Sequence, residues 1–422
     1  MTQWVRSTPP RIALVTAGFD FGGGVPTVAR WLRDGLRSLA GYTVDVHDLA
    51  TSSRDPHSRR LVVPRSWLRS TLRNASDEED GVFRWGANAV EIEAMRYRPR
   101  RELRNALRRY DLIQVVAGIP AWGSAVIGTG VPIVLLVATT VVWERPWQLA
   151  EQTGPSRILR EIMTLLTARI ERQALRKVDM VVVLNSTMLE HVRSTVHERV
   201  IKAPPGVDTA FFAPAAVGWQ RGGYLLSVCR LNDPRKGLDR LINAYANMLQ
   251  QDRSIPPLVL AGKGYLPANL LGLLTNLGIS SRVSVRSDVD GTQLPELYRG
   301  ASVFLQSSYE EGLGMSVLEA MACGLPVVST DSAGARETVV HGLTGWLVPQ
   351  THASQVATSI ADRVLQVLRS DAGEMGRRAR QHCEKTFSSG VALRPFTNVY
   401  EGLLAERKAS NDRHMSRATQ RP

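Results

Sequence analysis

Short apolar runs alternate with helical segments along most of the chain, and this alternation predicts an α/β fold. The first half contains five apolar runs that we interpret as strands, at 12–15, 43–46, 112–116, 133–137 and 180–184. The last three runs are almost continuously apolar, which is typical of parallel strands that are covered on both faces. A glycine turn follows the first run, and apolar residues then recur at helical spacing, at Val28, Trp31, Leu32 and Leu36. Strand, glycine turn, helix and strand in this order predict a doubly wound sheet.

The pattern divides near residue 204, where Pro204-Pro205-Gly206 interrupts it. A second series of strands is then predicted at 224–228, 258–260, 283–285, 303–306 and 326–328, with helices near 238–250, 265–277, 293–300 and 315–323. We therefore predict two doubly wound, Rossmann-like parallel-sheet domains, residues 1–204 and 205–387, that face each other across a cleft. The remaining segments are predicted as a loop at 51–80, a C-terminal helix at 388–408 that packs back on the N-terminal domain, and a disordered tail at 409–422.

The stretch 307–328 has the most specific pattern, because a strand end, a glycine loop, a helix and another strand follow one another. Gly312 and Gly314 allow a ligand to approach the backbone closely. The helix that begins near Met315 offers N–H groups without intrahelical partners and the positive end of its dipole. Both features suit a phosphate group, so we expect an anion at this loop.

Two carboxylates flank the same loop. Glu311 precedes it, and Glu319 lies about one turn into the helix, with a side chain that leans back toward the helix N-terminus. A diphosphate held between two carboxylates would be repelled. A nucleotide sugar resolves the conflict, because one carboxylate can bind the ribose, the other can bind the transferred sugar, and the amides can bind the phosphates.

Two cations are predicted at the same edge of the second domain. Arg230 follows the first strand of that domain, and Lys236 follows after a short turn. Together they would stabilise the charge that develops on a departing diphosphate without a metal ion. Arg235 is their neighbour and is equally consistent with a solvent-exposed position.

These two stretches resemble family 4 of the retaining glycosyltransferases, which have the two-domain GT-B fold. Glu311 and Glu319 match the Glu-x7-Glu motif of that family. The resemblance implies an N-terminal acceptor-side domain and a C-terminal domain that binds a nucleotide sugar, with uridine favoured as the base. It also implies catalytic roles for Arg230, Lys236 and Glu311. The donor-binding residues that we predict are Gly23, Gly24, Gly262, Gly312, Leu313, Gly314, Met315, Ser316 and Glu319.

The chain departs from the family pattern on the acceptor side. Many relatives have a histidine after the strand at 133–137, where this chain has Ala138-Thr139-Thr140. A front-face route, in which the departing phosphate helps to take the acceptor proton, needs no histidine there. Thr139, Thr140 and Glu144 are the candidate acceptor contacts.

The charge of the chain favours anionic partners. It has 52 Lys and Arg against 39 Asp and Glu, a formal net charge of +13, and many of its arginines lie in the first half. A solvated basic surface without a partner explains this excess equally well. The basic amphipathic helix at about 157–177 fits a peripheral contact with an anionic membrane, although such helices more often cover a sheet. No aromatic residues interleave with the arginines, so we do not expect a nucleic-acid partner.

Cysteine and metal patterns are sparse. The three cysteines are widely spaced and odd in number, which argues against a disulfide framework and favours a cytoplasmic location, with the inner face of the membrane as the alternative. Asp288-Val289-Asp290 is more typical of a turn than of a metal site. We predict no metal and no cofactor besides the donor.

The predicted function is transfer of a sugar from a nucleoside-diphosphate sugar to an acceptor hydroxyl, with the anomeric configuration retained. A lipid-linked acceptor, a polysaccharide and a soluble secondary metabolite all remain open. A sugar-nucleotide epimerase of the same fold and a non-catalytic nucleotide-sugar binding protein are the alternatives.

Overall fold

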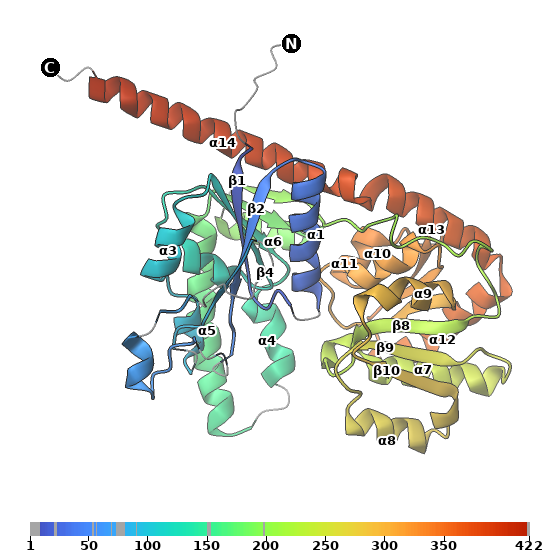
Figure 1. Ribbon diagram of the computed structural model, residues 1–422. Helices are drawn as coiled ribbons and strands as arrows, with labels where there is room; N and C mark the ends of the chain where they lie inside the picture. The colour runs from blue at the N-terminus through green and yellow to red at the C-terminus, as the bar shows by residue number, and fades with distance from the viewer. Residues whose placement is uncertain are drawn as a thin grey trace, which may run out of the picture. The chain divides into compact units, whose positions relative to one another are not determined.

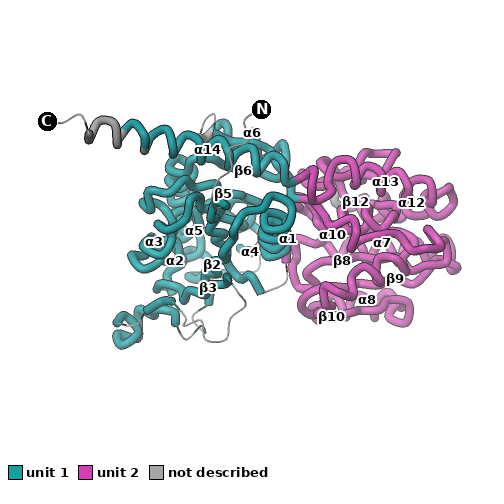
Figure 2. The backbone as a smooth tube through the Cα atoms, turned by 45° about the horizontal axis from the view of Figure 1, so that its top comes forward, with its two compact units in different colours: residues 1–21, 25–205, 393–422 teal, residues 22–24, 206–392 magenta. Residues whose placement is uncertain are grey.

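The computed structural model describes residues 9–419 apart from 21–22, 53–54, 56, 69, 73–80, 90, 150–152 and 197–198. The chain forms two compact units (Figure 2). Unit 1 contains residues up to 205, with the exception of the glycine segment 22–24, and the C-terminal residues from 393 onward. Unit 2 contains residues 206–392 together with that glycine segment.

Unit 1 is built on a seven-stranded sheet in the order β3-β2-β1-β4-β5-β6-β7. All neighbouring strands are parallel. The strands are β1 (Arg11–Thr16), β2 (Thr43–Leu49), β3 (Val82–Trp85), β4 (Leu112–Ala117), β5 (Ile133–Val137), β6 (Met180–Val183) and β7 (Val200–Lys202). Because the central strands are apolar on both faces, helices must cover both sides of the sheet.

The helices of unit 1 do cover both sides: Figure 1 shows α1 on one side of the strands and α3 with α5 on the other. The α-helices are α1 (Gly24–Ser38), α2 (Glu93–Arg96), α3 (Arg101–Leu107), α4 (Val141–Leu149), α5 (Pro155–Lys177), α6 (Ser186–Val196) and α14 (Ser389–Thr419). Two 3-10 helices, η1 (Pro64–Leu68) and η2 (Pro120–Val126), complete this part. Over the stretches that the structure describes, no helix has both the length and the apolar character needed to cross a lipid bilayer.

Unit 2 repeats the design with six parallel strands in the order β10-β9-β8-β11-β12-β13. Its strands are β8 (Tyr224–Arg230), β9 (Leu258–Lys263), β10 (Val283–Ser287), β11 (Ala301–Gln306), β12 (Val327–Thr330) and β13 (Gly345–Val348). Its helices are η3 (Pro234–Lys236), α7 (Leu238–Gln251), α8 (Ala268–Asn276), η4 (Ser280–Arg282), η5 (Gly291–Gln293), α9 (Leu294–Arg299), α10 (Met315–Ala322), α11 (Ala333–Thr338), α12 (Ala353–Arg369) and α13 (Ala372–Phe387).

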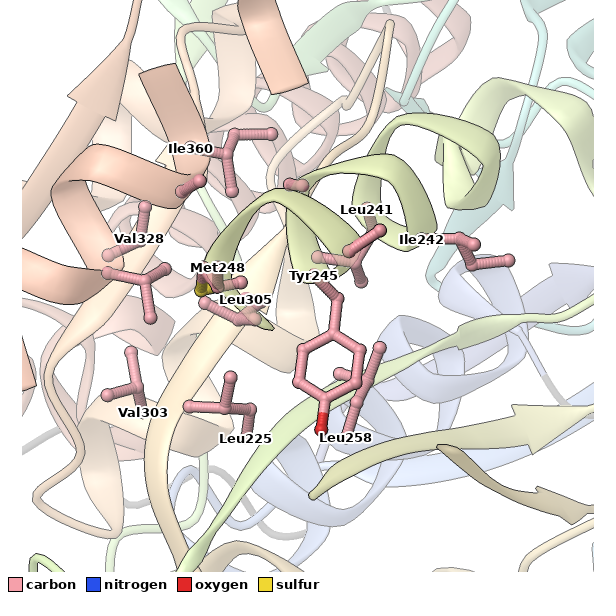
Figure 3. Close-up of a cluster of buried hydrophobic side chains, with 14 of the residues drawn as sticks. Leu225, Leu241, Ile242, Tyr245, Met248, Leu258, Val303, Leu305, Val328 and Ile360 are labelled. Carbon is pink, nitrogen blue, oxygen red and sulfur yellow. The ribbon is translucent and has the colours of Figure 1, made fainter. Parts of the chain in front are cut away.

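The core of unit 2 holds β8 and β11 in place. Figure 3 shows side chains of α7, including Leu241, Tyr245 and Met248, packed beside Leu225 of β8 and Leu305 of β11. All five are fully buried. The two strands that end at the candidate site are thereby fixed from one side by a continuous apolar layer.

The predicted fold class, α/β with two doubly wound parallel sheets, is confirmed. The strands that the sequence analysis missed, β3, β7 and β13, lie at the edges of their sheets and have only four, three and four residues. Strands this short give no periodicity to detect, and short edge strands limit pairing with other chains. In the predicted loop 51–80, the described residues form η1 and isolated bridges only.

The C-terminal helix α14 packs on unit 1 through a row of large side chains. Leu393 lies against Gly35 of α1, and the rings of Phe396 and Trp31 are 5.8 Å apart in an edge-to-face arrangement. Further along, the Tyr400 hydroxyl donates a 2.6 Å hydrogen bond to Gln114 Oε1 on the central strand β4. The helix therefore completes the core of the N-terminal sheet.

The sequence analysis ended this helix at residue 408 and expected disorder beyond it, and the second part of that prediction is wrong for residues 409–419. The helix α14 continues to Thr419. Residues 409–419 are polar but contain neither proline nor glycine, so nothing in the local sequence stops a helix that has already begun.

We predict that Tyr400→Phe destabilises unit 1, because the buried Oε1 of Gln114 then loses the hydrogen bond that Tyr400 donates to it. The expected cost is about 1–3 kcal/mol. It should lower the melting temperature of the full chain by a few degrees, measured by circular dichroism. Glu401→Gln, at an exposed neighbouring position, is the control and should melt like the wild type. Equal melting of Tyr400→Phe and the control would contradict this account.

Candidate functional site

The strand order of unit 2 reverses between β8 and β11. From β8 the chain runs outward through β9 to β10, and it then returns to place β11 on the other side of β8. At such a switch point the loops after two neighbouring strands diverge and leave room for a ligand. Of the predicted cations, Arg230 ends β8 and Lys236 lies in the segment after it, and the loop after β11 carries the glycines and the first carboxylate. Both predicted groups of residues therefore lie at one edge of the sheet.

An ion pair joins the two loops. Lys236 Nζ lies 2.7 Å from Glu311 Oε2, and each of these side chains is only 15 % exposed. The Ser308 hydroxyl donates to the same carboxylate oxygen at 3.2 Å. The structure therefore brings together two of the three residues that were predicted to be catalytic.

The backbone holds these loops close together. The Tyr309 amide donates to the Arg235 carbonyl at 2.7 Å, and the Ser307 hydroxyl donates to the Lys236 carbonyl at 3.0 Å. Gly237 has a φ of +60°, and a Cβ at this position would lie 2.3 Å from the Ser307 carbonyl oxygen. Only glycine fits here, so the spacing of Lys236 from the β11 loop is set by backbone contacts.

Arg230 and Arg235 share one carboxylate. Arg235 donates to both oxygens of Asp233, at 3.0 and 2.9 Å, and Arg230 Nη2 lies 2.7 Å from Asp233 Oδ2. Burial alone would raise the pKa of Asp233, but the hydrogen bonds from Arg235 and the nearby cations outweigh it and lower that pKa. Arg235, left open by the sequence analysis, is thus a partly buried structural partner. Arg230 keeps 46 % of its side chain exposed and is accessible to a ligand.

Sequence reasoning missed Asp233, although a signal was present. An Asp before Pro234 is typical of a helix N-cap, and Asp233 does cap η3 by accepting from the Arg235 amide at 3.1 Å. The charged residues of the site also surround the partly buried thiol of Cys229. Burial raises the pKa of Cys229 to about 12, and Lys236, Glu311, Asp233 and Arg230 all act on it.

The glycine loop ends at the N-terminus of α10. Gly314 has a φ of +87°, and its carbonyl accepts from the amides of Val317 and Leu318 at 2.9 and 3.2 Å. Leu313 is buried, whereas Met315 and Ser316 open the helix at half-buried positions. Gly314 has no side chain to cap this end, and the first amides of a helix have no intrahelical partner. Gly312 precedes them in the same loop.

The start of α11 packs tightly against the same loop. The Gly334 amide donates to the Glu311 carbonyl at 2.9 Å, and a Cβ at 334 would lie 2.6 Å from the Leu313 backbone. The sequence analysis did not assign Gly334 to the site. The close approach fixes the loop against the start of α11.

Glu319 lies deeper than the other charged residues. Its side chain is buried, and Tyr298 Oη donates a 2.7 Å hydrogen bond to its Oε2. Burial raises the pKa of Glu319 to about 7, and the hydrogen bond from Tyr298 partly offsets this rise. Sequence reasoning missed Tyr298, because it lies on the buried side of the short helix α9 and has no motif around it.

Gly262 of β9 lies beside the end of β8, next to the residue that precedes Arg230. It pairs with Cys229 across β8 and β9, has a φ of +136°, and a Cβ there would lie 1.9 Å from the Cys229 carbonyl oxygen. Only glycine fits at this position.

Asp288 and Asp290 have local structural roles. They accept hydrogen bonds from the amides of Gly264 and Thr292, respectively. Within the described ranges, no cluster of three or more His, Cys, Asp or Glu side chains has an arrangement that could hold a metal ion.

The predicted glycines of the first loop stand before and at the start of α1. Gly23 has a φ of +131°, and a Cβ on Gly23 or Gly24 would meet no atom within 4 Å. Ahead of these glycines, the Phe19 amide donates to Asp48 at 3.0 Å, and Asp48 pairs with Arg84 at 3.4 Å. Donor binding by Gly23 and Gly24 stays a prediction.

The acceptor candidates follow the carboxyl end of β5. The Thr139 amide donates to the Gly118 carbonyl, and the Thr140 carbonyl accepts from the Glu144 amide at the start of α4. Thr140 is buried, and its hydroxyl has no hydrogen-bond partner among the residues that the structure describes. Their contact with an acceptor stays a prediction.

A further carboxyl group, missed by the sequence analysis, lies beside this segment. Glu171 of α5 is buried and accepts from the Val141 amide at 3.0 Å. Burial raises the pKa of Glu171 to about 8, the Val141 amide lowers it, and the negative charge of Glu144 raises it further. Sequence reasoning missed Glu171 because it lies on the inner face of a long basic helix, where a single carboxylate among many charged residues gives no signal.

Comparison with known proteins agrees with this geometry. Residues 22–211 match the family described as Glycosyltransferase Family 4, and residues 217–383 match the family described as Glycosyl transferases group 1. The chain is 35 % identical over 191 residues to a GDP-mannose-dependent α-(1-6)-phosphatidylinositol monomannoside mannosyltransferase of Mycolicibacterium smegmatis, across 41 % of this chain and 50 % of the relative. It is 31 % identical over 234 residues to a D-inositol 3-phosphate glycosyltransferase of Salinispora tropica, across 50 % of this chain and 47 % of the relative.

The chain thus spans about half the length of these two curated relatives. Among solved structures, a sucrose-phosphate synthase from Thermosynechococcus elongatus superimposes with a TM-score of 0.67 at 20 % identity, across 94 % of this chain and all of that one. A likeness at this identity shows the fold. The two matched families cover both halves of the chain, and both units have the parallel sheets expected of the fold. The chain belongs to family 4 of the GT-B glycosyltransferases.

Proposed function

We propose that the chain transfers a glycosyl group from a nucleoside-diphosphate sugar to an acceptor hydroxyl and retains the anomeric configuration. The observation that carries this proposal is the ion pair of Lys236 and Glu311 at the switch point of unit 2. A partly buried cation beside the open end of α10 suits a diphosphate, and a carboxylate beside that cation suits the sugar that the diphosphate carries.

In the proposed reaction, the bond from the anomeric carbon to the phosphate oxygen breaks as the acceptor oxygen bonds to that carbon. The acceptor proton passes to the departing phosphate, so no histidine is required. Lys236 and the exposed Arg230 stabilise the negative charge that accumulates on the diphosphate, and the first amides of α10 add to this effect. In this proposal, these groups stabilise the departing diphosphate without a metal ion.

The two carboxylates take different parts of the donor in this proposal. Glu311, held by Lys236 and Ser308, accepts hydrogen bonds from hydroxyl groups of the sugar and orients it for transfer. Glu319 accepts hydrogen bonds from the ribose. Its hydrogen bond from Tyr298 occupies Oε2 and fixes the direction of the carboxyl group.

The acceptor that we propose is a phosphorylated cyclitol. The mannosyltransferase relative is named for a phosphatidylinositol mannoside, and the other relative is named for D-inositol 3-phosphate. Both names contain a phosphorylated inositol, and the net charge of +13 on this chain suits such an anion. For the donor base, the sequence analysis favoured uridine, whereas one relative is named for GDP-mannose. We keep both nucleotides open as donors.

The proposed location is the cytoplasm. Cys229, Cys323 and Cys383 are all free thiols, which suits a reducing compartment.

We predict that Lys236→Ala lowers kcat by at least about 100-fold, because the departing diphosphate loses its nearest cation. Glu311→Gln should also lower kcat while the fold is kept, since glutamine has the same shape without the charge. Released nucleotide and product sugar are the measurements. Lys385→Ala removes an exposed lysine from α13 and is the matched control. Wild-type turnover in both site variants would refute the proposed roles.

We predict that the KM for the donor falls as the pH rises through about 7, because the ribose binds the ionised form of Glu319. Glu319→Gln should remove this pH dependence. Tyr298→Phe should move it to higher pH, since the lost hydrogen bond normally lowers the pKa of Glu319. The free energy of unfolding should fall as the pH rises from about 4.5 to about 7. In this range the unfolded state has already lost the proton of Glu319, whereas the folded state still holds it, because burial raises the pKa of Glu319 from 4.5 to about 7. Identical KM profiles for the wild type and Glu319→Gln would contradict the assignment.

We predict that a donor and acceptor screen finds transfer to inositol phosphate or phosphatidylinositol and little transfer to unphosphorylated inositol. The screen pairs UDP-sugars and GDP-sugars with each acceptor, and mass spectrometry identifies the product. Each donor is also incubated alone. Conversion of the donor sugar without an acceptor would favour an epimerase, and binding without turnover on any acceptor would favour a nucleotide-sugar binding protein.

A further inference from the structure

The N-terminal turns of α5 present large apolar side chains to solvent. Ile158, Leu159 and Leu165 are 61, 61 and 72 % exposed, and Ile162 and Leu166 are 48 and 44 % exposed. Five aliphatic side chains at this exposure within nine residues are a substantial unpartnered apolar surface for a soluble helix. We call these five residues the α5 tip.

The α5 tip forms one stripe along the helix. Its positions are three, four and seven residues apart, so they fall on the same face. The residues that anchor α5 to unit 1, Thr167, Glu171 and Ala174, are buried and lie on the opposite face. The exposed stripe is therefore not part of the packing that holds the helix in place.

Arginines continue the stripe toward the C-terminal end of the helix. Arg169, Arg172 and Arg176 follow the α5 tip at helical spacing on its outward side, and all three are exposed. Of the two carboxylates of α5, Glu161 pairs with Arg157 at 3.1 Å and Glu171 is buried. The outward face of α5 thus joins an apolar segment to a cationic one.

The α5 tip also lies at the edge of unit 1 where the parallel strands have their carboxyl ends. The helix connects the parallel strands β5 and β6, so its N-terminus lies at the carboxyl ends of the strands. Figure 1 shows this end of α5 extending beyond the strands. A second exposed apolar group, Val62, Trp67 and Leu68, belongs to the segment that follows the carboxyl end of β2. Ligands bind at this edge in doubly wound sheets.

We propose that the α5 tip and its arginines dock unit 1 on the surface of an anionic phospholipid membrane. The aliphatic side chains enter the boundary between head groups and acyl chains, and the arginines bind lipid phosphates at the level of the head groups. A second copy of the chain is a poorer occupant. The same face of a second copy would offer no anion to these arginines, since Arg169, Arg172 and Arg176 would face groups of the same kind and Glu161 already pairs with Arg157. This docking is independent of the proposed transfer chemistry.

The test is co-sedimentation of the full chain with vesicles. The wild type should bind vesicles that contain phosphatidylglycerol and should bind pure phosphatidylcholine vesicles weakly. Two double variants, I162E/L165E and R169E/R172E, should each lower the affinity for the anionic vesicles by at least about tenfold. Binding by R169E/R172E should also depend less on salt. Leu271→Glu, at a 49 % exposed position on α8, is the matched control and should bind like the wild type.

Sedimentation velocity without lipid and circular dichroism accompany these measurements. All variants should have wild-type helix content, and the wild type should sediment in the same state as I162E/L165E. Wild-type affinity of both double variants, or no binding of the wild type to anionic vesicles at low salt, would overturn the proposal. A wild-type dimer that I162E/L165E abolishes would assign the α5 tip to a second copy instead. If one double variant fails to fold, the other decides the outcome.

Discussion

The pairing of Lys236 with Glu311 is the interaction on which the rest of the site depends. Two opposite charges are held at 2.7 Å on loops that belong to different strands, and both side chains are largely withdrawn from water. Removing charges from water is costly, and mutual attraction rarely repays the whole cost. Backbone contacts hold the two segments that carry the pair together: Gly237 lies against the Ser307 carbonyl, and the Ser307 hydroxyl donates to the Lys236 carbonyl.

The two carboxylates of the site differ in their partners, and this difference separates their chemistry. Glu311 faces a cation, whereas Glu319 of α10 faces the neutral hydroxyl of Tyr298 of α9, and both of these residues are buried. Glu319 therefore favours its neutral form much more than a carboxyl group in water does. Meanwhile Asp233 holds Arg235 in place and leaves Arg230 with access to solvent. The segment 230–235 thus contains one arginine with a structural role, Arg235, and one that remains accessible, Arg230.

Much of this site was predictable, because its residues follow strands of a recognisable kind. The runs that became β8 and β11 are mostly apolar, as strands of a parallel sheet are, and the residues that end them then meet at one sheet edge. Gly314 was predictable as the residue that opens a helix, and its positive φ agrees. Tyr298 and Glu171 were not predictable, because a polar group on the inner face of a helix gains its role only from tertiary neighbours. The same reason hid Gly334, whose importance lies in its contact with the Leu313 backbone.

The raised pKa of Glu319 has a thermodynamic consequence for ligand uptake. Near neutral pH, part of the protein population carries a proton on this carboxyl group. A ligand that selects the ionised form must expel that proton into the medium as it binds. The heat of association then contains the ionisation enthalpy of whichever buffer captures the proton. Calorimetric enthalpies for nucleotide sugars would differ between buffers at one pH, and the slope of that difference counts the protons released.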